Sequence, residues 1–98
     1  MVEQFLLGRK ALVTGSSGGI GAHIALGLAA AGADVAVTYY TNRSGAEEMA
    51  AKITNLGRRS IVLAGDVTRR GDCLALVEGT VQAFGSIDIL VNNVGEFA

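Results

Sequence analysis

The chain alternates short, continuous apolar runs with longer segments in which apolar residues recur every three or four positions. Continuous apolar runs are typical of strands in a sheet that is covered on both faces, whereas the longer spacing predicts helices. The runs predict strands over residues 10–14, 35–39, 61–64 and 89–91. The segments between them predict helices over residues 19–31, 44–56 and 69–84.

Each predicted helix has a candidate buried face. In the first helix this face is Ile20, Ile24 and Leu28, with alanines filling it. In the second and third helices the faces are Ala46, Met49, Ala50, Ile53 and Leu74, Val77, Val81, Phe84 respectively. Ser44, with Glu47 three residues later, predicts a capping box, and Thr68 is the expected N-cap of the third helix. The glycines expected to end the helices are Gly32, Gly57 and Gly85.

This alternation of strands and helices calls for parallel strands joined by right-handed crossovers. Two sheet orders compete, the Rossmann order 3-2-1-4 and the flavodoxin-like order 2-1-3-4-5. The second usually carries a fifth strand, and its response-regulator members place acidic residues after the first strand, where this chain has glycines and serines. We therefore predict a partial Rossmann-type α/β fold of order 3-2-1-4, with helices on both faces. Strands one and four then flank the crevice in which ligands bind.

Residues 14–21, which we call the glycine loop, join the first strand to the first helix. Free backbone N–H groups and the positive end of the helix dipole favour an anion at such a place, and glycines let it approach closely. No Gly-Lys-Ser/Thr completes a nucleoside-triphosphate loop. The loop therefore predicts a phosphate site, and residues 92–95 form the opposite rim of the crevice.

The composition excludes several classes of protein and is consistent with the predicted fold. Half of the 98 residues are hydrophobic and 17% are charged, which indicates a globular chain with a core. The formal net charge of −1 gives no basic surface for nucleic acid, and no apolar run approaches the ~20 residues that span a bilayer. His23 has no partner at metal-ligand spacing, and the single cysteine, Cys73, forms no internal disulfide. We expect a cytoplasmic protein whose partners include no metal, nucleic acid or membrane.

Two motifs resemble those of the short-chain dehydrogenase/reductase family, and the resemblance covers the whole chain. Thr-Gly-x-x-x-Gly-Ile-Gly in the glycine loop is similar to the family's cofactor loop, and Asn-Asn-Val-Gly at residues 92–95 is similar to its Asn-Asn-Ala-Gly. Members are more than twice as long, and their catalytic Ser and Tyr-x-x-x-Lys lie further downstream. Tyr39 and Tyr40 have no Lys four residues on. The resemblance implies one NAD(P)-binding Rossmann half-domain over residues 1–98, truncated before the catalytic segment and without catalytic residues.

The candidate cofactor-binding residues follow the four strands. In the glycine loop they are Gly15, Ser17, Gly18, Gly19, Ile20 and Gly21. After the later strands they are Tyr40, Arg43, Asp66, Val67, Asn93 and Gly95. The resemblance implies that Asp66 bonds the adenine amino group and that the backbone of Val67 contacts the ring. It also implies that Asn93 lies near the cofactor ribose and that Gly95 lets the backbone pass close to the nicotinamide.

The end of the second strand favours NADP over NAD. A site for NAD typically places Asp or Glu there, on the ribose 2′-hydroxyl, but no acid occurs before Glu47. A carboxylate ~4 Å from a 2′-phosphate costs roughly 4 kcal/mol per charge pair near a surface. Its absence removes an obstacle, and Arg43 is a candidate partner, although many NADP-using relatives carry a basic residue where this chain has Gly18. We predict NADP as the cofactor, with NAD as the alternative.

Three hypotheses for the function follow. In the first, the chain is the NADP-binding part of a short-chain reductase that transfers hydride between NADP(H) and a carbonyl or alcohol; residues 8–15 and 84–93 most resemble the 3-oxoacyl-(acyl carrier protein) reductase branch. The second is a free-standing nucleotide-binding or regulatory module, and the third is a structural fragment that folds against a partner. Because strand 89–91 would be an unpaired apolar edge, we expect the isolated chain to be inactive and marginally stable, and either to self-associate or to pair with the missing C-terminal half.

Overall fold

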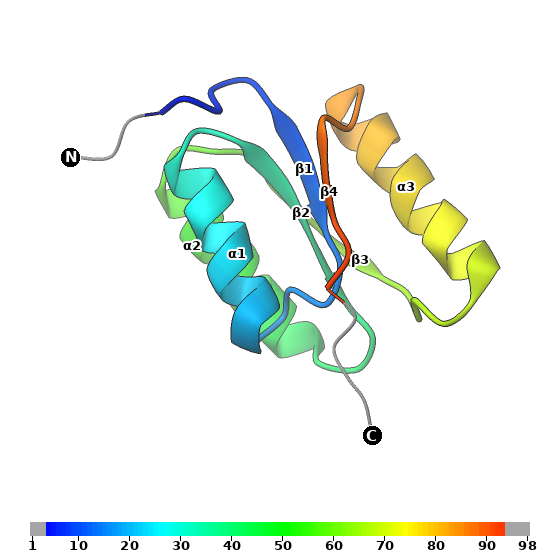
Figure 1. The fold of residues 1–98 in the computed structure, drawn as a ribbon. Helices are drawn as coiled ribbons and strands as arrows, with labels where there is room; N and C mark the ends of the chain where they lie inside the picture. Colours follow the sequence, from blue (N-terminus) through cyan, green and yellow to red (C-terminus); the bar gives the residue numbers. More distant parts are fainter. Residues whose placement is uncertain (1–3, 94–98) are drawn as a thin grey trace.

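Seven elements follow one another in the order that the apolar pattern predicts. The computed structural model describes residues 4–93, and Figure 1 shows their arrangement. The strands are β1 (Lys10–Val13), β2 (Asp34–Tyr39), β3 (Ser60–Ala64) and β4 (Ile89–Val91). The helices are α1 (Gly19–Ala30), α2 (Arg43–Asn55) and α3 (Arg70–Phe84). The predicted bounds lie within one residue of these.

The four strands form one parallel sheet in the order β3-β2-β1-β4, which confirms the predicted fold class. β1 is central, since Leu12 lies opposite Ala36 of β2 on one side and opposite Leu90 of β4 on the other. The chain therefore changes direction between β1 and β4, and the carboxyl ends of these two strands lie side by side. This is the switch point at which ligands bind in sheets of this type.

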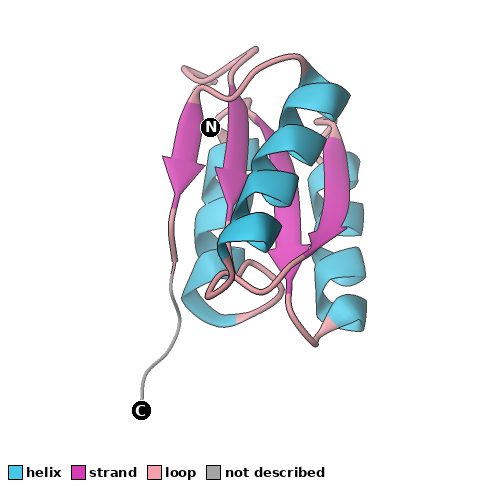
Figure 2. Ribbon diagram, turned by 90° about the vertical axis from the view of Figure 1, so that its right-hand side faces the viewer, coloured by secondary structure: helices cyan, strands magenta, loops and turns pink. Residues whose placement is uncertain are grey.

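Helices α1 and α2 cover one face of the sheet and α3 covers the other (Figures 1 and 2). Side chains alternate along β1, so that Ala11 and Val13 pack toward α1 and α2 while Leu12 packs toward α3. The buried cluster on the first face also contains Ala22, Ala25, Ala29, Ala33, Val35, Val37, Ala46, Met49 and Ile53. On the second face the buried cluster is Leu12, Ala36, Leu76 and Phe84. It is smaller because one helix covers this face.

The face that α1 buries differs from the predicted one at Ile20. Ile20 is 72% exposed, whereas Ala22, Ala25 and Ala29 are at most 7% exposed. Small side chains let the helix axis approach the sheet closely, and the larger Ile24 and Leu28 pack at the margin of the core. The prediction that Ile20, Ile24 and Leu28 form the buried stripe is therefore wrong at its first position.

The face that α3 buries also differs from the prediction. Leu76, Thr80 and Phe84 are buried, whereas Leu74, Val77 and Val81 are 56%, 37% and 40% exposed. Burial of Thr80 is tolerated because its hydroxyl donates to the carbonyl oxygen of Leu76 at 2.8 Å. The predicted stripe was thus wrong for three of its four residues. We call those three exposed residues of α3, together with Leu90 of β4 (59% exposed), the apolar strip.

Two predicted N-caps are also wrong. The N-cap of α2 is Asn42, whose side-chain oxygen accepts from the Gly45 N–H at 3.1 Å, in place of the predicted Ser44. The N-cap of α3 is Arg69, and the Thr68 side chain instead bonds Asp66. Asn42, two residues before Ser44, caps α2 because its short amide side chain readily reaches the first free backbone amides of the helix. The predicted helix-ending glycines all follow their helices with positive φ, at Gly32, Gly57 and Gly85.

Candidate functional site

The glycine loop and the end of β4 are in direct contact at the carboxyl edge of the sheet. The Thr14 N–H donates to the carbonyl oxygen of Val91 at 3.0 Å. The Asn93 N–H donates to the Thr14 hydroxyl oxygen at 2.9 Å, and the Asn93 side-chain amide donates to the Gly15 carbonyl oxygen at 3.2 Å. Two segments that are far apart in the sequence are thus joined into one rim around the switch point.

Two glycines of the loop are required by this contact. Gly15 has φ +62°, and a Cβ there would lie 2.9 Å from the carbonyl oxygen of Asn93. A Cβ on Gly21 would overlap the carbonyl oxygen of Gly15 and lie 2.7 Å from the side-chain nitrogen of Asn93. A side chain at either position would push the loop away from β4. These glycines therefore have a packing role that is independent of any ligand.

The other two glycines of the loop face open space. A Cβ on Gly18 or Gly19 would meet no atom within 4 Å among the described residues. Gly18 is the N-cap of α1, and no side-chain hydrogen bond caps it in residues 4–93. The His23 Nδ1 lies 3.0 Å from the Gly19 carbonyl oxygen, a contact that leaves the backbone N–H groups of the first turn open. The first turn of α1 also contains no acidic residue. The positive end of the α1 dipole is thus open to an anion, which is the arrangement that a phosphate requires.

Buried hydroxyls hold the loop in place from beneath. The Gly15 N–H donates to the Thr38 hydroxyl oxygen at 3.0 Å, and that hydroxyl donates to the Val13 carbonyl oxygen at 3.2 Å. The Ser16 hydroxyl donates to the same carbonyl at 2.8 Å and accepts from the Thr38 N–H at 2.9 Å. Ser16 and Thr38 are 0% and 1% exposed. Neither residue was among the predicted site residues, although a threonine between the apolar residues of a buried strand was a usable signal.

The amino end of α2 packs against the glycine loop. The side-chain amide of Asn42 donates to the carbonyl oxygen of Ser17 at 3.5 Å while its oxygen caps α2. A Cβ on Gly45 would lie 2.5 Å from the same Ser17 oxygen. Asn42 and Gly45 were not among the predicted site residues. They join the turn after β2 to the loop at α1, so the ends of two helices meet at one edge of the sheet.

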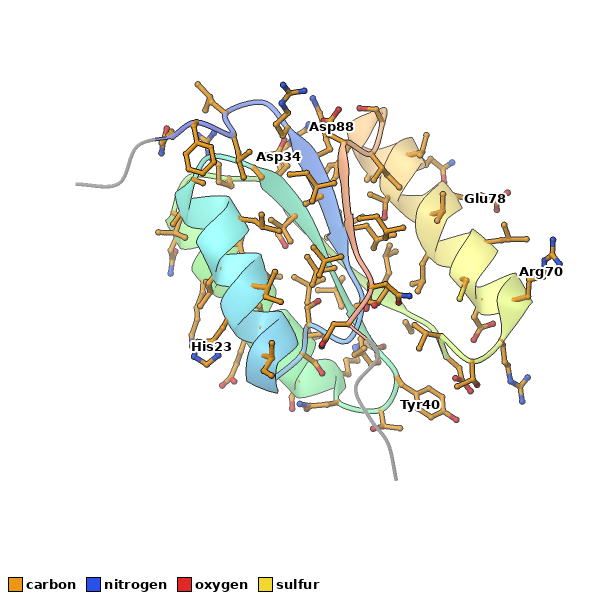
Figure 3. The ribbon with its side chains drawn as sticks, viewed as in Figure 1. His23, Asp34, Tyr40, Arg70, Glu78 and Asp88 are labelled. Carbon is orange, nitrogen blue, oxygen red and sulfur yellow. The ribbon has the colours of Figure 1, made fainter. Side chains whose placement is uncertain are left out.

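Tyr40 lies on this turn, Arg43 is the first residue of α2, and both side chains are exposed. Tyr40 is 69% exposed, and Figure 3 shows it at the carboxyl end of the sheet, whereas Asp34 and Asp88 lie at the opposite end. The Arg43 Nε donates to Glu47 Oε2 at 2.9 Å. This hydrogen bond and the charge of Glu47 raise the pKa of Arg43 above its usual value. The guanidinium is therefore a permanent positive charge at the amino end of α2, the helix end whose Asn42 cap contacts Ser17 of the glycine loop.

Asp66 and Val67 follow β3 and are tied to the start of α3. Asp66 Oδ1 accepts from the Thr68 N–H at 3.0 Å and from the Thr68 hydroxyl at 2.6 Å. These hydrogen bonds lower the pKa of the Asp66 carboxyl below its usual value. The Val67 carbonyl oxygen accepts from the Cys73 thiol at 3.3 Å. Asp66 thus has a turn-forming role, and a ligand contact would be additional to it.

Three further expectations concern Gly95, a metal site and a membrane-spanning helix. Gly95 lies outside the described residues. Within residues 4–93, no three His, Cys, Asp or Glu side chains lie together as metal ligands would. In the same range, no helix has the length and apolarity needed to cross a membrane.

The fold and this edge of the sheet define a doubly wound α/β protein with a phosphate-type glycine loop at the switch point. The chain belongs to the short chain dehydrogenase family, whose model matches residues 9–97. The finer assignment to the 3-oxoacyl-(acyl carrier protein) reductase branch stays a prediction.

Individual relatives agree with the family assignment. The chain is 46% identical over 95 residues to an uncharacterized oxidoreductase of Methylorubrum extorquens, covering 95% of this chain and 38% of that protein. It is similar, with 48% identity and a TM-score of 0.92, to the structure of a short chain dehydrogenase from Burkholderia cenocepacia in complex with NADP, covering 95% and 38% of the two chains. A blue fluorescent protein from a metagenomic library, solved in complex with NADPH, gives 38% identity, a TM-score of 0.93 and coverages of 97% and 39%. The chain thus spans well under half the length of these relatives.

Proposed function

We propose that this chain binds NADP(H) as the cofactor-binding part of a short-chain oxidoreductase. The observation that carries the proposal is the open amino end of α1, held against β4 by the contact between Gly15 and Asn93. Two solved structures similar to this chain were determined in complex with NADP or NADPH. The residues that we assign to the cofactor are Gly15, Ser17, Gly18, Gly19, Ile20, Gly21, Tyr40, Arg43, Asp66, Val67, Asn93 and Gly95.

Each part of the site has a distinct role in this proposal. The amides at the start of α1 hold the pyrophosphate, because they are free donors at the positive end of the dipole. Arg43 pairs with the 2′-phosphate. Asp34 lies at the opposite end of β2, and no other acid precedes Glu47 in β2 or the turn after it to oppose that charge. Asp66 and Val67 contact the adenine, and Asn93 lies beside the ribose.

In the whole protein, we propose that the bound nicotinamide exchanges hydride with a carbonyl or alcohol substrate. The Tyr-x-x-x-Lys that supplies the proton in the family does not occur within these 98 residues. The 98-residue chain is therefore expected to bind the cofactor without turning over a substrate.

Calorimetric titration with NADP and NAD, combined with two matched variants, tests the binding site. Gly18 has an extended backbone that any residue adopts, and a Cβ there meets no described atom, so Gly18→Glu and Gly18→Arg leave the packing intact. Glu places a carboxylate beside the proposed phosphates and is expected to weaken NADP binding at least about tenfold, while Arg strengthens it. Equal NADP affinities for the two variants would refute the site.

A second candidate is a fragment that works only with a partner, and the apolar strip favours it. Leu74, Val77, Val81 and Leu90 are all more than a third exposed. Val77 and Leu90 also line a groove of about 200 Å³ between α3 and β4. We propose that this surface mediates self-association or pairing with a complementary segment. Sedimentation tests it: Val77→Lys with Leu90→Lys is expected to shift the chain toward monomer, and a wild-type chain that is already a stable monomer at high concentration would contradict self-association.

A further inference from the structure

We infer that Glu47 sets how strongly this site prefers a 2′-phosphorylated nucleotide, because it competes with the 2′-phosphate for Arg43. The inference rests on the proposed function, since it concerns the same nucleotide site. It adds a specificity-determining residue that does not touch the nucleotide itself.

The geometry places Glu47 in direct competition for the guanidinium. Arg43 is the first residue of α2 and Glu47 lies one turn later, so the two side chains share a face of the helix. The Arg43 Nε lies 2.9 Å from Glu47 Oε2, with the two side chains 72% and 55% exposed. The pair therefore forms in solvent, at the amino end of the helix that contacts Ser17 of the glycine loop.

While the ion pair is intact, the charges of Arg43 and Glu47 cancel. Glu47 is the first acidic residue after Asp34, and it lies beside the cation that we assign to the 2′-phosphate. A phosphate dianion that approaches Arg43 must share the guanidinium with Glu47 or displace it, and it is repelled by the carboxylate in either case.

The expected size of the effect follows from the exposure of the pair. Exposed ion pairs of this kind change an equilibrium constant by about twofold to fivefold. Removing the repulsion between carboxylate and dianion adds a further factor that salt reduces. We therefore expect Glu47→Gln to tighten binding of a 2′-phosphorylated nucleotide roughly threefold to tenfold. Gln keeps the length and helix propensity of Glu, so α2 is expected to persist.

The test compares two nucleotides that differ only in the 2′-phosphate, adenosine 2′,5′-bisphosphate and adenosine 5′-monophosphate, titrated calorimetrically into the 98-residue chain. Glu47→Gln is expected to raise the affinity ratio of the two nucleotides roughly threefold to tenfold. The matched control is Glu48→Gln, which removes the same charge from the next position, where no contact with Arg43 is seen in residues 4–93, and changes the ratio less than about twofold.

A double-mutant cycle isolates the contribution of Arg43. In an Arg43→Gln background, Glu47→Gln is expected to raise the ratio by a clearly smaller factor, because the competition for the guanidinium has been removed and only the salt-sensitive repulsion between carboxylate and dianion remains. A ratio that Glu47→Gln leaves unchanged or lowers, in a chain that binds both nucleotides, would overturn the inference alone. A chain that binds neither nucleotide would overturn the proposed function and this inference with it.

Discussion

Because the glycine loop lies in close contact with the end of β4, we expect substitution to alanine to have opposite effects on stability at two glycines of α1. Gly21 and Gly27 both lie within α1 and neither has a positive φ. Replacing a helical glycine with alanine normally stabilises a protein by about 0.5–1 kcal/mol. A Cβ on Gly27 would meet no described atom within 4 Å, so Gly27→Ala is expected to show this gain.

The same substitution at Gly21 is expected to destabilise the chain. The added methyl group would overlap the Gly15 carbonyl oxygen and lie 2.7 Å from the Asn93 side-chain nitrogen. Both neighbours are constrained, because Asn93 donates to that carbonyl at 3.2 Å. Overpacking of this kind costs about 1–3 kcal/mol, and a backbone neighbour places it near the upper end. After the helix gain of about 1 kcal/mol is subtracted, the net loss is about 2 kcal/mol.

Thermal unfolding followed by circular dichroism measures the difference. For a domain of this size, 1 kcal/mol corresponds to about 4–8 °C in Tm. Gly21→Ala is therefore expected to lower Tm by about 8–16 °C, while Gly27→Ala raises it by about 2–8 °C. A Gly21→Ala chain that gains as much stability as Gly27→Ala would refute the reasoning, since it would mean that the loop does not pack against Asn93.

Three further predictions concern residues around the site. Thr38→Val removes the hydroxyl that joins the Gly15 N–H to β1 and is expected to cost about 1–3 kcal/mol in urea unfolding, whereas Thr38→Ser keeps most of the stability. Asn42→Ala is expected to cost about 1 kcal/mol through loss of the α2 cap, while Ser44→Ala stays within about 0.5 kcal/mol; the reverse order would restore the predicted capping box. Because the pKa of Asp66 is lowered in the folded chain, its stabilising contribution is present above the usual value of 3.8 and is lost as pH falls through the folded value. Asp66→Asn is expected to flatten the acid limb of the stability curve, and an unchanged limb would contradict the Asp66 turn.

The sheet order was predictable because it depends on features that sequence displays directly. Continuous apolar runs locate the strands, and the glycines at 32, 57 and 85 locate the helix ends. The glycine loop and Asn93 were found because glycines and amides at strand ends stand out from apolar surroundings. Their contact, which the fold prediction implied, is present in the structure.

Which side of each helix faces the sheet was less predictable, because it depends on packing that hydrophobicity does not describe. The axis of α1 can lie close to the sheet only where small side chains face it, so Ala25 is buried and Ile20 is exposed. In α3 the apolar strip and the buried face are both apolar, and periodicity alone does not distinguish Val77 from Leu76. The polar scaffold formed by Ser16 and Thr38 was missed because its partners come from segments more than twenty residues apart.

We propose that the rim formed by the glycine loop and the end of β4 holds the pyrophosphate and ribose of NADP. The most direct measurement is a titration of the isotopically labelled 98-residue chain with NADP, followed by amide chemical shifts. We expect the largest shifts at Gly18, Gly19, Ile20 and Asn93, with saturation at one common affinity. Saturable shifts confined to the opposite end of the sheet, around Asp34 and Asp88, would contradict it.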